Sequence, residues 1–148
     1  MKTKFIIICC IALLAPTLLL AQQSINTLVE SYSNVDNVNY TKAGKAVIWM
    51  VKAAAPKGSM DGVKSMIVLE FKGGSTSSEY SSFRSKALTI FKQSGAVCVA
   101  NEDTDKGSME VYMERKESPT EYMMFMHGDD NSEVFMLMEG KLPSSLEK

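Results

Sequence analysis

EYMMFMHGDDNSEVFMLMEG, residues Glu121–Gly140, is the stretch that decides the fold of this chain. Two runs of aromatic, branched and methionine residues flank GDDN, and Gly, Asp and Asn are the residues that close tight hairpins. The stretch therefore predicts a pair of antiparallel strands. It also holds five of the eleven methionines and the only histidine, His127.

The number of residues in the GDDN loop decides which side chains of this hairpin share a face. We expect an even-numbered loop. One face then carries Met123, Phe125, His127, Val134, Met136 and Met138. The other carries Tyr122, Met124, Met126, Phe135 and Leu137. Both faces are largely apolar, so we expect helices over one side and a partner or the C-terminal segment over the other, or a sheet that folds over itself.

Methionine and histidine are ligands for copper, which raises a metal site as a hypothesis. Met123, Met136 and Met138 would form its thioether cluster. His127 lies about 13 Å along the strand from Met123, at roughly 3.3 Å per residue, and cannot join the cluster through it. Methionine among Phe125 and Val134 is ordinarily core filler. We therefore interpret these residues as packing residues and assign no catalytic, cofactor-binding or metal-binding residue.

Two further period-two stretches, AVCVANED and GSMEVYMERKE, precede the hairpin. Together the four predict a meander with turns at EDTDKG, SP and GDDN. In the second stretch, Met109, Val111 and Met113 alternate with Glu110, Tyr112 and Glu114. We therefore expect one face of the sheet to be exposed to solvent at this strand. Apolar neighbours on both sides of Cys98 predict a buried free thiol.

The first half of the chain predicts three helices and two strands. SINTLVESYSN begins at a Ser24 cap and spaces Ile25, Leu28, Val29 and Tyr32 as an amphipathic helix. A short strand through Val38 and Tyr40 follows. KAVIWMVKAAA predicts a buried core helix with Trp49 as its large packing residue.

After the breakers of APKGSMDG, the stretch VKSMIVLEFK predicts a strand with Ile67, Leu69 and Phe71 on one face. A long helix from Ser77 or Ser78 to Ser94 carries an apolar stripe, ending at Gly95. The stripe consists of Tyr80, Phe83, Ala87, Ile90 and Phe91. The predicted fold class is α+β, with helices packed on one face of a mainly antiparallel sheet that ends in a four-strand meander.

The chain begins like a secretory signal peptide, with Lys2 and Lys4, an apolar run and then Ala21. We expect residues 1–21 to be the signal peptide and residues 22–148 to be a single α+β domain without a transmembrane segment. Loss of Lys2 and Lys4 leaves 14 basic against 17 acidic residues, a net charge of −3. With no basic block, nucleic acid is excluded as a partner. The expected location is the periplasm or the medium.

The order of elements and the exported start resemble domain of unknown function family 4252. The residues that carry the resemblance are LVESYSNVDNVNYTKAGK, VKSMIVLEF with the helix after it, and the closing EVFMLMEGKLPSSLEK. The resemblance implies an exported protein of the cell envelope of a Gram-negative bacterium. It implies no established activity, cofactor, substrate or functional residue.

Catalytic interpretations find little in the sequence. His127 is the only histidine, which leaves no base held by a third group for nucleophilic catalysis. KGGSTSS lacks the lysine and spacing of a phosphate-binding loop, and NEDTDKG and GDDNSE lack the twelve-residue calcium spacing. We expect a non-enzymatic structural or protein-interaction module whose partner is another envelope protein. The alternative is a periplasmic protein that binds a small apolar ligand or copper.

Overall fold

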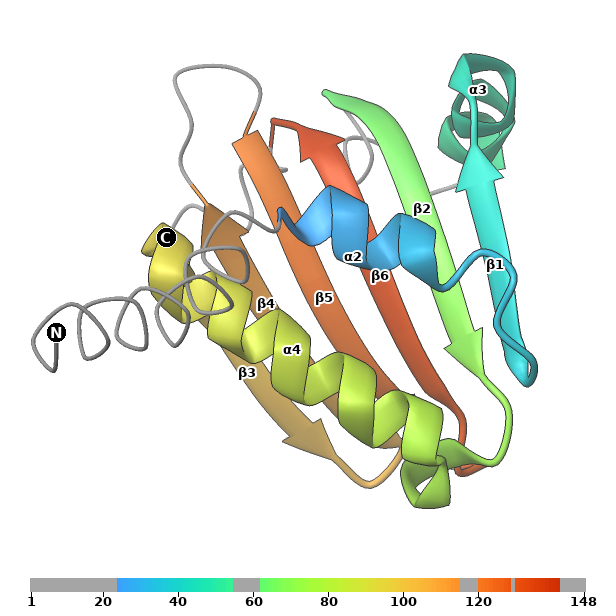
Figure 1. Cartoon of the computed structure of the whole chain (residues 1–148). Helices are drawn as coiled ribbons and strands as arrows, with labels where there is room; N and C mark the ends of the chain where they lie inside the picture. Colours follow the sequence, from blue (N-terminus) through green and yellow to red (C-terminus); the bar gives the residue numbers. More distant parts are fainter. Residues whose placement is uncertain (1–23, 55–61, 115–119, 129, 142–148) are drawn as a thin grey trace, which may run out of the picture.

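The computed structural model describes residues 24–54, 62–114, 120–128 and 130–141, and the predicted signal peptide with its cleavage site lies outside them. The described residues form an α+β fold around one six-stranded antiparallel sheet, in the order β1-β2-β6-β5-β4-β3 (Figure 1). This confirms the predicted fold class. The strands are β1 (Val38–Ala43), β2 (Val63–Phe71), β3 (Val97–Thr104), β4 (Gly107–Glu114), β5 (Thr120–Gly128) and β6 (Glu133–Gly140).

Both amphipathic helices begin at the predicted caps, and α4 also ends where its sequence predicts. In α2 (Ile25–Ser31) the Ser24 hydroxyl accepts a hydrogen bond from the Thr27 N–H at 3.2 Å. In α4 (Ser78–Ser94) the Ser77 hydroxyl accepts one from the Tyr80 N–H at 3.1 Å. Each cap satisfies a backbone donor that a first turn leaves open. Gly95, with φ of 75°, ends α4 in the left-handed conformation that glycine adopts without a steric cost.

Figure 1 shows α2 and α4 lying across the same face of the sheet, which we call the covered face. The apolar and aromatic side chains that the sheet contributes there include Val38, Tyr40, Ile67, Leu69, Phe71, Tyr112, Met123, Phe125, Phe135 and Leu137. They meet the predicted stripe of α4, in which Phe83 and Ala87 are completely buried. The predicted strand through Ile67, Leu69 and Phe71 and the apolar face of α2 are confirmed.

The third helix, α3 (Lys45–Ala54), forms as predicted but is not a buried core helix. Its Ile48 packs in a small separate cluster with Ala43, Val63 and Met66. Trp49 is 71% exposed, so its predicted role as a packing residue is wrong. The reason is the position of α3 beside β1 and the start of β2, where only one side of the helix meets the sheet.

The loop between β5 and β6 is odd-numbered, so our predicted faces of this hairpin are wrong by one residue. The Gly128 N–H donates to the Ser132 carbonyl at 2.9 Å, and Asn131 closes the turn with φ of 61°. Asparagine tolerates this left-handed conformation better than most residues. In the resulting register Phe125 lies opposite Phe135. A slip of one residue moves every side chain of one strand to the other face.

Two expectations for β3 and β4 are also wrong. Tyr112 packs against the covered core and Glu110 reaches α4, so the face of β4 that we expected to be wet is the one that meets the helix. Cys98 is exposed, because β3 is an edge strand at one end of the sheet order. The four-strand meander itself runs through neighbouring strands from β3 to β6.

Candidate functional site

The opposite side of the sheet, which we call the open face, is apolar over its four inner strands. Strand register places its side chains in three rows that cross β4, β5, β6 and β2. The first row is Met109, Met126, Val134 and Glu70; the second is Val111, Met124, Met136 and Val68; the third is Met113, Tyr122, Met138 and Met66. Eleven of these twelve residues are apolar or aromatic. The helices α2 and α4 lie on the other side of the sheet, and α3 packs on the open face at the end of the third row, where Met66 contacts the cluster of Ala43, Ile48 and Val63.

Methionine dominates the open face, with seven of these positions. Three pairs of methionines lie directly opposite each other on neighbouring strands. They are Met109 with Met126 in the first row, Met124 with Met136 in the second row, and Met138 with Met66 in the third row. Directly opposite side chains have Cβ atoms about 4.5–5.5 Å apart, close enough for their thioethers to touch. The open face is therefore a continuous methionine surface.

Burial varies across the open face. Val111 and Tyr122 are buried, whereas the seven methionines are partly exposed. At the first-row end the surface is hollowed by about 320 Å³, and the hollow is lined in part by Glu102, Met109, Met126 and Val134. Polar residues stand at its borders, among them Asn39 and Thr41 on β1 and Glu102 on β3. An apolar centre with a polar rim is the arrangement of a protein interface.

A second feature, a polar cleft of about 340 Å³, lies at the end of the covered face beside the N-terminal half of α4. The Arg84 guanidinium donates to the Glu110 carboxylate at 2.6 Å and lies 4.6 Å from the centre of the Phe125 ring. The His127 Nδ1 lies 2.6 Å from a carboxylate oxygen of Glu133, whose side chain is only 5% exposed. Burial and the negative charge of Glu133 raise the pKa of Tyr80 to about 12.

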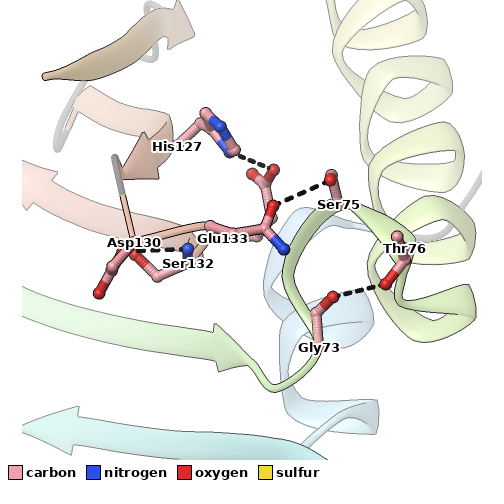
Figure 2. A network of polar contacts seen from close by, with 8 residues as sticks. Gly73, Ser75, Thr76, His127, Asp130, Ser132 and Glu133 are labelled. Atoms are coloured by element: carbon pink, nitrogen blue, oxygen red, sulfur yellow. Dashed lines mark hydrogen bonds and ion pairs between the residues drawn. The ribbon is translucent and has the colours of Figure 1, made fainter. Parts of the chain in front are cut away.

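Figure 2 shows the polar contacts around the turn between β5 and β6, whose two strands carry His127 and Glu133. The Ser75 hydroxyl, in the 3-10 turn η1 (Gly74–Thr76), donates to the Asn131 side chain at 3.1 Å. A Cβ atom at Gly74 would collide with the Asn131 backbone oxygen, so only glycine allows this approach. The Asp130 carboxylate accepts from the Ser132 N–H at 3.1 Å. Hydrogen bonds from the Ser132 hydroxyl and from this N–H lower the pKa of Asp130.

The charges of the cleft satisfy one another. Arg84 forms an ion pair with Glu110, and the His127 Nδ1 lies within hydrogen-bonding distance of Glu133, so both carboxylates have a partner. Removing one member of such a pair would leave its partner buried without a counter-group, which would lower the stability of the fold. The cleft residues include Ser75 and Ser108, but no hydrogen bond joins His127 to a serine among the described residues. The contacts seen for His127 and Arg84 are therefore with the two carboxylates.

The predicted thioether cluster of Met123, Met136 and Met138 does not come together. Met123 is completely buried on the covered face, and the other two lie on the open face. His127 pairs with Glu133 instead of joining any methionine cluster. Within the described ranges, no group of three His, Cys, Asp or Glu side chains is placed to hold a metal ion.

Sequence reasoning missed the methionine pairs and the ion pairs for the same reason. Both join residues on neighbouring elements, and the partner of Met124 or Arg84 follows only from the register. The usable signal is Glu133, an acid that is followed directly by the apolar run VFMLM.

Comparison with known proteins gives no match, whether with family models, curated proteins or solved structures. Across the described residues, the helices are too short or too polar to cross a membrane. The function therefore has to be inferred from the open face and the polar cleft.

Proposed function

We propose that this protein is a non-catalytic binding module, exported to the bacterial cell envelope, whose open face docks an apolar protein surface. The observation that carries the proposal is the methionine surface of β4, β5, β6 and β2, which α2 and α4 leave uncovered. Soluble proteins rarely expose a large continuous apolar patch unless it binds something. Export and the resemblance to family 4252 remain predictions from the sequence.

The shape of the surface supports a protein partner over a small ligand. Small-molecule sites are concave and enclose most of the ligand. The open face is a sheet surface with one shallow hollow, and the cleft beside α4 is lined mainly by polar and charged groups. Methionine adds flexible thioethers that adapt to partners of irregular shape.

Site-specific photo-cross-linking in the native envelope tests the proposal. A photoreactive amino acid replaces Met136 at the centre of the open face, and a matched control carries it at Lys86, on the exposed side of α4. We expect a protein adduct from position 136 and little from position 86, identified by mass spectrometry. Equal labelling at both positions, or none at position 136, would refute the proposal.

Soft-metal binding is a second candidate, favoured by the three opposed methionine pairs. Thioethers select Cu(I), and the pairs Met124 with Met136 and Met138 with Met66 are adjacent on the face. Competition for Cu(I) against a chromogenic chelator, under anaerobic conditions, tests it. Stoichiometric binding that Met124→Leu with Met136→Leu abolishes, and that Met123→Leu on the covered face leaves intact, would favour the metal over the protein partner.

A further inference from the structure

We infer that the outer side of α3 binds the surface of an anionic lipid bilayer, with Trp49 inserted among the lipid head groups. The outer side is the one turned away from Ile48, which packs against Ala43 and Val63 of the sheet. This surface is separate from the methionine rows of the open face, so the inference goes beyond the proposed function and does not depend on it. The spacing, the exposure and the charge of the helix support it.

The outer side of α3 carries an apolar stripe where a surface helix ordinarily carries polar residues. Positions 46, 49, 50 and 53 lie on one side of the helix, because residues three and four apart are neighbours on its surface. They hold Ala46, Trp49, Met50 and Ala53, and all four are exposed. Ile48, on the inner side, is buried. The helix is therefore apolar on its solvent side as well as on the side that meets the sheet.

Two residues of the stripe are exposed to an unusual degree for large apolar side chains. Trp49 is 71% exposed and Met50 is 56% exposed. Tryptophan is enriched at the interface between a membrane and water, where its amphipathic ring lies at the level of the head groups. Figure 1 shows α3 at the border of the sheet, beside the end of β1. A helix in this position can meet an extended surface such as a bilayer.

The segment around α3 is basic, although the chain as a whole has a net charge of −1. Residues 37–60 contain four lysines and no Asp or Glu. Two of these lysines, Lys45 and Lys52, belong to α3, and their positions are about two turns apart on the same side of the helix. Lysine is attracted to the negative surface of anionic lipids. An apolar stripe beside basic positions is typical of a helix that lies in a membrane interface.

The length of α3 suits a helix that lies on a bilayer and does not cross it. Its ten residues make a helix about 15 Å long, whereas the hydrocarbon core is roughly 30 Å thick. So short a helix is only marginally stable when isolated in water. In this fold Ile48 holds it against the sheet, so the stripe is already formed before any lipid arrives.

Trp49 is the only tryptophan of the chain, so its fluorescence reports directly on this surface. The mature protein, residues 22–148, is mixed with vesicles of phosphatidylglycerol and phosphatidylcholine in equal parts. We expect the emission to shift to shorter wavelength and to be quenched by lipids that carry bromine on their acyl chains. Vesicles of phosphatidylcholine alone should bind roughly tenfold more weakly or less, and salt should weaken binding to the anionic vesicles.

A matched pair of variants tests the apolar stripe by co-sedimentation with the anionic vesicles. Met50→Ser should weaken binding by roughly fivefold or more, because it removes apolar surface that the bilayer would cover. Val97→Ser is the control, since Val97 is 53% exposed but lies on β3, at the other end of the sheet. It should leave binding unchanged. Circular dichroism of both variants verifies the fold.

A second matched pair tests the lysines. Lys45→Gln with Lys52→Gln should weaken binding by roughly tenfold or more, because each lysine near an anionic surface contributes about a fivefold factor in affinity. The control is Lys86→Gln with Lys92→Gln on the exposed side of α4, which changes the net charge by the same amount. This control should bind almost as tightly as the unaltered protein.

Trp49 emission that neither shifts nor is quenched on anionic vesicles overturns the inference. Losses that are as large in the two controls as in the variants of α3 overturn it as well, because binding would then not occur through this helix. Equal binding to both kinds of vesicle overturns the preference for anionic lipid. If vesicles leave Trp49 unchanged while a photoreactive residue at position 49 labels an envelope protein, a protein occupies this side of α3 and the inference fails.

Discussion

The two faces of one sheet are built from different apolar residues. On the covered face, Phe83 packs edge-on against Tyr32 and Phe135, with ring centres 5.1 and 4.7 Å apart. On the open face methionine takes the place of the aromatic rings. Rigid rings fix one packing geometry, whereas thioethers accept many. The covered face therefore has one fixed packing against α2 and α4, whereas the side chains of the open face can adapt their shape.

The largest effect should come from the centre of the covered face. Phe83 is completely buried and contacts four other rings. Phe83→Ala should lower the free energy of unfolding by about 3–5 kcal/mol, since it removes a large side chain and leaves a cavity. Urea denaturation measures this, and Lys86→Ala on the exposed side of α4 should change stability by less than about 0.5 kcal/mol. Equal small losses would mean that α4 does not pack as described.

A smaller effect should follow from separating the turn of β5 and β6 from η1. Gly74 has φ of 58°, and its neighbour across the contact is the Asn131 backbone. Gly74→Ala should cost about 1–3 kcal/mol, because the new methyl group strains the backbone and forces the two turns apart. Gly95→Ala is the matched control: it has a similar φ, and its Cβ would meet nothing within 4 Å. If both variants lose the same stability, the approach of the turns contributes nothing.

Alkaline pH should lower the free energy of unfolding through the titration of Tyr80. Its pKa in the folded protein is about 12, above its ordinary value of 10.0, so the folded state holds the proton longer than the unfolded chain does. The stabilisation is therefore present below pH 10 and is lost as the pH rises from 10 to 12. Partial exposure limits the loss to about 1–2 kcal/mol. Tyr80→Phe should lose less stability than the unaltered protein between pH 10 and 12. Urea denaturation at each pH measures the loss. An equal loss in both proteins would show that Tyr80 is not its source.

The smallest effects should separate the two faces most directly. Met123→Leu and Met136→Leu should each fold almost normally and cost less than about 1.5 kcal/mol, since leucine and methionine exchange well in apolar settings. Met123 is completely buried and Met136 is partly exposed, so the loss at Met123 should be the larger. Thermal unfolding of the monomeric protein ranks the two. A larger loss at Met136 would mean that the open face is as tightly packed as the covered one.

Local patterns predicted the elements well. The caps at Ser24 and Ser77, the stripe of α4 and the strands followed from hydrogen-bonding groups and apolar spacing within one segment. These signals act over a few residues and survive in the folded chain.

The predicted faces of the sheet were wrong in strands where the alternation of residue types did not show which side is buried. In β5 and β6 both sets of alternate residues are apolar, so only the parity of the turn could decide, and Asn131 set it through its own backbone. In β4 the acidic set faces inward, because Arg84 on α4 satisfies Glu110. Trp49 and Cys98 looked buried by composition, yet they lie on elements at the border of the sheet. These outcomes depend on neighbours distant in sequence.

The partial exposure of the open-face methionines has a chemical consequence. Oxidation converts a methionine thioether into a polar sulfoxide, which reductase enzymes can reverse. Met124 and Met136 remain accessible on the open face, whereas Met123 is shielded on the covered face. Oxidation would therefore make the open face more polar, while the buried residues of the covered face would keep their apolar packing.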